Sequence, residues 1–381
     1  MAGVITWNRL RELAAFRAQN GLAISLYLGL DPTTAATVPD LTTKLNSLLD
    51  EAQKSTLANR NELTHDQKRG LQSDLERVRN YLTNDFDRPG VQGLAIFAAG
   101  LDTFWSANAL SESVPDRVCV GPDFHLRPLV PLLGRGDGAI VALIDRERGL
   151  LFKLTNGRLE GLSDLTEEQP GRHDQGGWSQ ARFQRHIDEL AKEHLKTVAA
   201  DLDSHVRRGT ARQVVVVGPD EARAAFADLL AMETSNCVVG WTAGEGYATP
   251  TELLELAMPF LEQARLAEET EALERWQEEA GRNGRAASGW DETLEAASDG
   301  RVELLLFQEG VDREAYECPS CGRAQTQNGA CPLDATRMEP RDDGIDLAVH
   351  RTLAHGGSVR ALPRERSELG PVEGIAALLR Y

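Results

Sequence analysis

Residues 170–183 combine two adjacent glycines with hydrogen-bonding, aromatic and basic side chains. Gly176 and Gly177 lack a Cβ, so the backbone there can adopt positive φ angles and approach a ligand closely. From Ser179 onward, apolar residues recur with helical spacing, and a stripe of cations runs beside them. The cations of this stripe are Arg182, Arg185, Lys192 and Lys196. The pattern predicts a flexible loop on a basic helix, although Gly-Gly could also simply end a loop and Ser179 cap the helix.

A second group of residues has the spacing of metal ligands. Cys318 and Cys321 form a C-x-x-C turn, and Cys331 and Asp334 repeat that spacing. Two such turns predict a structural zinc site with three thiolates and one carboxylate, in which His350 or His355 could replace Asp334. The alternative is reduced thiols that hold no metal.

Other familiar catalytic patterns are absent from the sequence. It contains no phosphate-binding G-x-x-x-x-G-K-[ST] loop, no H-E-x-x-H helix and no G-x-S-x-G turn. We therefore expect no nucleotide cofactor.

The elements that carry these residues predict three domains. Strands are expected at 23–28, 93–99 and 126–133, and helices at 41–54 and 64–81, which gives an α+β domain over residues 1–134. Strands and helices then alternate over residues 135–270, including a helix at 221–232, which predicts a three-layer α/β domain. Residues 271–381 should form a third α/β domain with the zinc knuckle inserted. The fold class is thus a mixed α/β and α+β multidomain protein.

Composition limits where and how the protein works. The chain has 381 residues and a net charge of -18, which argues against general coating of nucleic acid, DNA included. Residues 171–212 carry a net charge of +2, so the rest of the chain carries -20. Any contact with RNA should therefore be local to this segment. The first residues do not resemble a signal peptide, no apolar stretch is long enough for a membrane span, and the cysteine usage indicates a reducing compartment, so we expect a cytoplasmic protein without membrane contacts.

The loop resembles the central Gly-Gly-Gln loop of the archaeal and eukaryotic class I peptide-chain release factors, the family that includes Pelota and the bacterial hibernation factor Balon. The matching residues are Pro170, His173, Gly176, Gly177, Ser179, Arg182 and Phe183. The C-terminal sequence Gly374-Ile-Ala-Ala-Leu-Leu-Arg-Tyr381 is also similar to the end of that family's third domain. The resemblance implies three domains in the family's order, with the loop reaching the peptidyl-transferase centre of the ribosome near the P-site tRNA.

Two departures from the family bear on function. Trp178 stands where the family has its glutamine, and the nearest glutamines are Gln175 and Gln180. Indole has one N–H donor and no acceptor, so it cannot orient water as an amide does, but it can stack on a base or ribose. Arg172, His173 and Gln175 are further candidates for RNA contacts. The family's codon-reading motif also has no counterpart, because residues 33–40 contain no Lys or Arg.

Three functions remain open. The first is a ribosome-binding factor that occupies the A site without reading a codon, in hibernation or rescue, with a translational GTPase as a further partner of the third domain. The second is a codon-independent peptidyl-tRNA hydrolase that uses Gln180, or else Gln175, together with Gly176 and Gly177. The third is an acidic protein-interaction scaffold that no longer binds ribosomes. The basic stripe favours the first two, and Trp178 favours the first over the second.

Overall fold

The computed structural model describes residues 5–30, 38–59, 63–86, 91–134, 138–155, 157–166, 178–209 and 211–381. The chain forms two compact units. Residues 1–134 and 269–381 make up the first unit, and residues 135–268 make up the second. The three-domain division at 134 and 270 stays a prediction, since its first and third parts share one unit. Within the described ranges, no helix combines the length and hydrophobicity needed to cross a bilayer.

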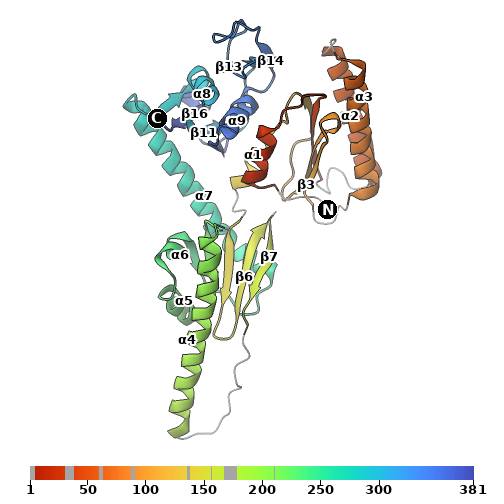
Figure 1. Ribbon diagram of the computed structural model, residues 1–381. Helices are drawn as coiled ribbons and strands as arrows, with labels where there is room; N and C mark the ends of the chain where they lie inside the picture. The colour runs from red at the N-terminus through yellow and green to blue at the C-terminus, as the bar shows by residue number, and fades with distance from the viewer. Residues whose placement is uncertain are drawn as a thin grey trace. The chain divides into compact units, whose positions relative to one another are not determined.

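The N-terminal segment, residues 1–134, is built on an antiparallel sheet with the strand order β3-β2-β1-β4. Successive side chains of a strand face opposite sides, so Leu94 and Ile96 join one core while Ala95 and Phe97 join another. Helices α2 and α3 cover the first face and lie side by side (Figure 1). The elements are α1 (Trp7–Ala15), β1 (Ala23–Gly29), α2 (Val38–Asn59), α3 (His65–Asn80), η1 (Tyr81–Asp85), β2 (Gly93–Ala99), η2 (Gly100–Asp102), β3 (Phe104–Leu110), β4 (Arg117–Gly121), η3 (Arg127–Leu129) and η4 (Leu132–Gly134).

In this segment the local sequence explains where α3 starts, and the structure corrects one predicted strand. Thr64 and Gln67 form the reciprocal hydrogen bonds of a capping box at the start of α3. The strand expected at 126–133 is wrong, because this stretch forms the 3-10 turns η3 and η4. Pro128 and Pro131 have no N–H to donate to a sheet. The N–H groups of Leu126 and Arg127 instead donate to the Asp346 side chain.

The second unit is a mixed five-stranded sheet, ordered β7-β6-β5-β8-β9, between two helical layers. Helices α4 and α5 pack on one face, and the first half of α7 packs on the other. The elements are β5 (Ile140–Ile144), β6 (Gly149–Thr155), β7 (Arg158–Asp164), α4 (Trp178–Arg207), β8 (Val214–Val217), α5 (Asp220–Ala227), α6 (Met232–Cys237), β9 (Val238–Thr242) and α7 (Pro250–Gly281). The single helix expected at 221–232 is wrong: Ala231 is extended and separates α5 from α6.

The C-terminal segment, residues 269–381, has a four-stranded sheet ordered β10-β16-β11-β15 and a small sheet ordered β13-β12-β14. Its cores include α8, α9 and the second half of α7. The elements after α7 are β10 (Ala286–Ser288), α8 (Gly289–Ser298), β11 (Val302–Gln308), β12 (Ala315–Glu317), β13 (Ala324–Gln325), β14 (Glu339–Arg341), α9 (Gly344–Ala354), β15 (Ser358–Leu362), η5 (Gly370–Val372) and β16 (Ile375–Leu379). A single apolar core joins this segment to the N-terminal one, where α1 packs on α9.

Candidate functional site

The loop that the sequence singled out leads into α4. Arg172, His173, Gln175, Gly176 and Gly177 lie outside the described residues. Helix α4 begins at Trp178 and continues without a break to Arg207, so Gln180 is in its first turn. The side chains of Trp178, Gln180, Arg182 and Arg185 also lie outside the description.

Helix α4 is anchored to the sheet through its C-terminal half. Buried side chains recur at Ala191, Leu195, Val198, Leu202 and Val206, which is the spacing of one helix face. Figure 1 shows the earlier turns of the helix continuing beyond the end of the sheet. The C-terminal half of the helix is therefore fixed to the sheet, and its first turns extend past the sheet.

A glycine in β6 permits this close packing. A Cβ added to Gly149 would overlap the side chain of Val198, a fully buried residue on the face of α4 that packs on the sheet. The absence of a side chain at this position lets α4 approach the strand.

The described surface of α4 carries both signs of charge. Lys192 and Lys196 are exposed, as a cationic stripe requires. Asp188, Glu189 and Glu193 are exposed as well, and Lys196 Nζ lies 3.5 Å from Glu193 Oε1. This mixture agrees with the small net charge of +2 over residues 171–212, and it makes this part of the stripe less positive than its cations alone would be.

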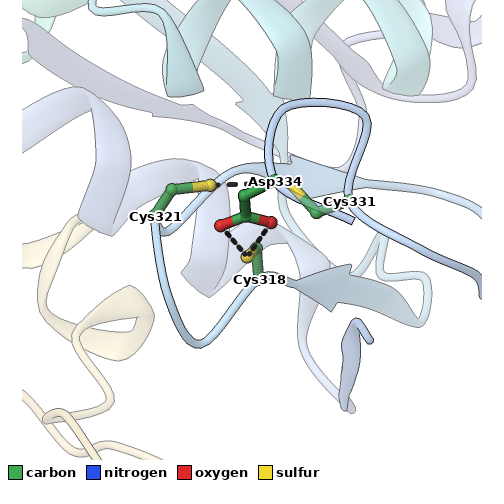
Figure 2. Close-up of side chains that lie close together, drawn as sticks. All are labelled: Cys318, Cys321, Cys331 and Asp334. Atoms are coloured by element: carbon green, nitrogen blue, oxygen red, sulfur yellow. Dashed lines mark hydrogen bonds between the residues drawn. The ribbon is translucent and has the colours of Figure 1, made fainter. Parts of the chain in front are cut away.

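The four predicted metal ligands do meet in space. Figure 2 shows Cys318, Cys321, Cys331 and Asp334 converging, and their ligand atoms all lie within 4.8 Å of one another. Cys321 Sγ is 3.5 Å from Cys331 Sγ, and Cys318 Sγ is 3.6 Å from each Asp334 oxygen. A tetrahedral ion with metal–sulfur bonds of about 2.3 Å places its sulfur ligands about 3.7 Å apart. The cluster therefore has the size and the donor atoms to hold a metal ion.

Two similar turns position these ligands. The Gly322 N–H donates to Cys318 O, and the Ala335 N–H donates to Cys331 O. Both Gly322 and Ala335 have the left-handed backbone that closes such a turn. Each turn therefore presents its first and fourth side chains toward the same point.

The electrostatics of the cluster favour a cation at its centre. The Arg323 N–H lowers the pKa of Cys321, but burial and the neighbouring Cys318 and Cys331 outweigh it and raise this pKa to about 11. Asp334 is different: the hydrogen bond from the Thr336 N–H holds its pKa well below the usual range. If the three thiols lost their protons, three thiolates would lie beside the Asp334 carboxylate, and a cation at their centre would offset the repulsion among these negative charges.

The alternative histidine ligands lie elsewhere. His350 is buried and contacts the backbone oxygen of Phe124. His355 is exposed, and its Nδ1 lies 3.0 Å from Arg351 O. Of these three candidates for the fourth position, only Asp334 belongs to the cluster.

Sequence reasoning missed a buried charged cluster where the N-terminal and C-terminal segments meet. Asp346 Oδ1 accepts hydrogen bonds from the N–H groups of Leu126 and Arg127 at 2.7 and 2.9 Å. Its Oδ2 lies 3.3 Å from His125 Nδ1. The Arg127 guanidinium donates to both oxygens of Asp343 at 3.1 Å. The sequence signal was an Asp before an apolar helix, which predicts the N-cap that Asp343 forms but not its burial.

Comparison with known proteins gives consistent matches. Residues 125–262 match the model of the bacterial archaeo-eukaryotic release factor family 10. The chain is 26% identical to peptide chain release factor subunit 1 of Archaeoglobus fulgidus over 408 residues, which covers 98% of this chain and 96% of that protein. It is 31% identical to the Methanopyrus kandleri protein of the same name over 211 residues, 52% of this chain and 50% of that one. Among solved structures, Archaeoglobus fulgidus Pelota aligns over 99% of this chain and 92% of its own, with 16% identity and a TM-score of 0.33.

Proposed function

Because this chain belongs to the class I release-factor-like proteins, we propose that it is a ribosome-binding translation factor that occupies the A site without reading a codon, in ribosome hibernation or rescue. The observation that carries the proposal is the position of Gly176 and Gly177 directly before a single 30-residue helix. Such a helix is about 45 Å long. Anchored at its far end, it can hold the loop at a fixed distance from the sheet.

Trp178 suggests how the loop acts. An indole can stack on a base or on the terminal ribose of a tRNA, and stacking of this kind contributes about 1–3 kcal/mol per base. Arg172, His173 and Gln175 would add contacts to phosphate or ribose, and the cations of α4 would pair with ribosomal RNA. In this proposal the loop binds near the peptidyl-transferase centre and performs no chemistry.

Sedimentation with purified ribosomes tests the proposal. We expect binding that weakens as salt rises, because each phosphate contact releases counterions. Replacing Arg182, Arg185, Lys192 and Lys196 with Glu should abolish co-sedimentation. A matched variant with four Arg→Glu changes at the exposed Arg282, Arg285, Arg337 and Arg364 alters the net charge equally and should still bind. Equal loss in both variants, or in neither, would remove α4 from the proposed interface.

A peptide-release assay separates binding from hydrolysis. The helix starts at Trp178, and a rotation of about 100° per residue turns Gln180 about 200° away from it. We therefore expect wild-type protein to release little peptide from ribosomes loaded with peptidyl-tRNA. Robust release that disappears in Gln180→Ala would instead support the hydrolase alternative. Release that is gained only in Trp178→Gln would support a tip converted from catalysis to binding.

The metal cluster completes the proposal. We assign zinc to Cys318, Cys321, Cys331 and Asp334, since three thiolates and one carboxylate form a closed tetrahedral donor set. The ion would cross-link two turns and has no open position for a substrate. The C-terminal segment that carries it is the proposed contact for a translational GTPase. A chain that binds no ribosomes in the sedimentation assay would leave the protein-interaction scaffold as the remaining function.

A further inference from the structure

Glu317 lies directly between the metal cluster and the N-terminal segment. It is the last residue of β12, it is 2% exposed, and the next residue is the ligand Cys318. Successive residues at a strand end face opposite sides. Cys318 therefore faces the metal cluster while the Glu317 carboxylate faces a group of arginines.

These arginines come from both segments of the first unit. Arg17 of the N-terminal segment lies 2.7 Å from Glu317 Oε1. Arg351 contacts the same oxygen, and Arg341 Nε lies 3.6 Å from Glu317 Oε2. Asp123, also N-terminal, contacts Arg341 and lies 3.6 Å from Arg17. Glu317 is thus the carboxylate through which the strand that bears Cys318 holds Arg17.

Two groups of contacts hold the end of β12 at Glu317: the apolar core on one side, through Ala315 and its neighbour Ala324, and the metal site on the other. Strands β12, β13 and β14 are three, two and three residues long, and a sheet this small is not stable alone. The buried residues of its core are Cys318, Cys331 and Met338, so two of the three are metal ligands. The main apolar core keeps the rest of β12 and β13 on α8 and α9, so loss of a cross-link between the two turns should loosen the end of the strand at Glu317 and not the whole sheet.

The first metal-binding turn also packs directly on the charged group. A Cβ added to Gly322 would overlap the guanidinium of Arg351. A change in the path of residues 318–322 therefore displaces Arg351 as well as Glu317.

We propose that metal binding at the cysteine cluster acts as a latch: it holds Glu317 against Arg17, so metal occupancy controls how firmly residues 16–18 of the N-terminal segment pack on the C-terminal segment. The inference rests on the metal site of the proposed function. It does not depend on ribosome binding. The latch is local, because the Asp346 cluster and the shared apolar core connect the same two segments independently.

Hydrogen–deuterium exchange of the full chain tests the latch. The reporter is the Ala18 N–H, which donates to Pro122 O at 2.7 Å beside Arg17. Removing metal with EDTA should speed its exchange about tenfold, since the affected ion pair is charged but Arg17 is partly exposed. Added zinc should restore protection. The amides of Leu126 and Arg127, which donate to Asp346, should stay protected throughout.

Two variants separate the latch from general unfolding. Glu317→Gln keeps all four ligands, so it should retain metal, show fast exchange at Ala18 and no longer respond there to EDTA. Glu303→Gln removes an exposed carboxylate that pairs with Arg275, and it should respond to EDTA like wild type. Faster exchange over residues 318–338 with no change at Ala18 would refute the latch and leave the metal site standing. Protein purified without chelator that contains no metal would refute both.

Discussion

Asp346 should be among the most important charged residues for stability. Burial alone would raise the pKa of its carboxyl, but His125, His350 and the backbone N–H of Leu126 outweigh burial and hold the pKa below its usual range. Asp346→Asn keeps the shape of the side chain and removes its charge. Two hydrogen bonds to a charged acceptor would become neutral ones of about half the strength, and His125 would lose one of its two carboxylate partners while Asp343 stays 3.6 Å away.

The expected loss is about 3 kcal/mol, from about 1–1.5 kcal/mol for each weakened hydrogen bond plus the His125 contact. For a unit of this size, 1 kcal/mol changes the midpoint of unfolding by about 2–4 °C, so the first unit should melt about 6–12 °C lower. Calorimetry should show this change in the transition of the first unit only.

Glu303→Gln is the matched control. Glu303 also accepts two hydrogen bonds, both 2.9 Å from Arg275, but its side chain is 42% exposed. Exposed ion pairs contribute about 0–1 kcal/mol, so the control should melt within about 4 °C of wild type. If the two variants lowered the midpoint of unfolding by the same amount, burial would not be the reason for the contribution of Asp346 to stability.

Three further outcomes are expected. The first unit should lose stability as pH falls below about 4, because folding lowers the pKa values of Asp123 and Asp346. The stability that these two carboxylates contribute is fully present only above their unfolded-state pKa values. Circular dichroism of unfolding should show a smaller acid-induced loss in Asp346→Asn. Metal analysis should give about one zinc per chain, and Cys318→Ser should release it and increase protease cleavage within residues 318–338; wild type without metal would contradict the assignment. Gly149→Ala should destabilise the second unit by about 1–3 kcal/mol in calorimetry by pushing α4 from β6, whereas Gly161→Ala, at an open position, should not.

The sequence alone was sufficient for features that depend on neighbouring residues. Thr64 and Gln67 fit the four-residue pattern of a capping box, and in the structure they form that box. The repeated spacing at Cys318, Cys321, Cys331 and Asp334 identified four residues that do meet. The apolar face of α4 at Val198 and Leu202 followed from helical spacing. Each of these features is set within one or two turns of chain, where spacing determines geometry.

The strand expected at 126–133 shows where such reasoning fails. Its apolar residues fit a strand. However, its two prolines have no N–H to donate to a sheet, and the Leu126 N–H donates to the distant Asp346. Asp346 is 220 residues away from Leu126 in the sequence, so no local pattern could reveal the contact.

Tertiary structure alone decided which charges are buried. His125, Asp343 and Asp346 look like ordinary polar residues in the sequence, yet each is at most 7% exposed where the N-terminal and C-terminal segments meet. Glu317 likewise becomes important because Arg17, 300 residues away, reaches it. The energy of an ionic contact depends on which charged groups face each other and on the exclusion of water. Both are properties of residues brought together by folding, and neither is carried by the spacing of residues along the chain.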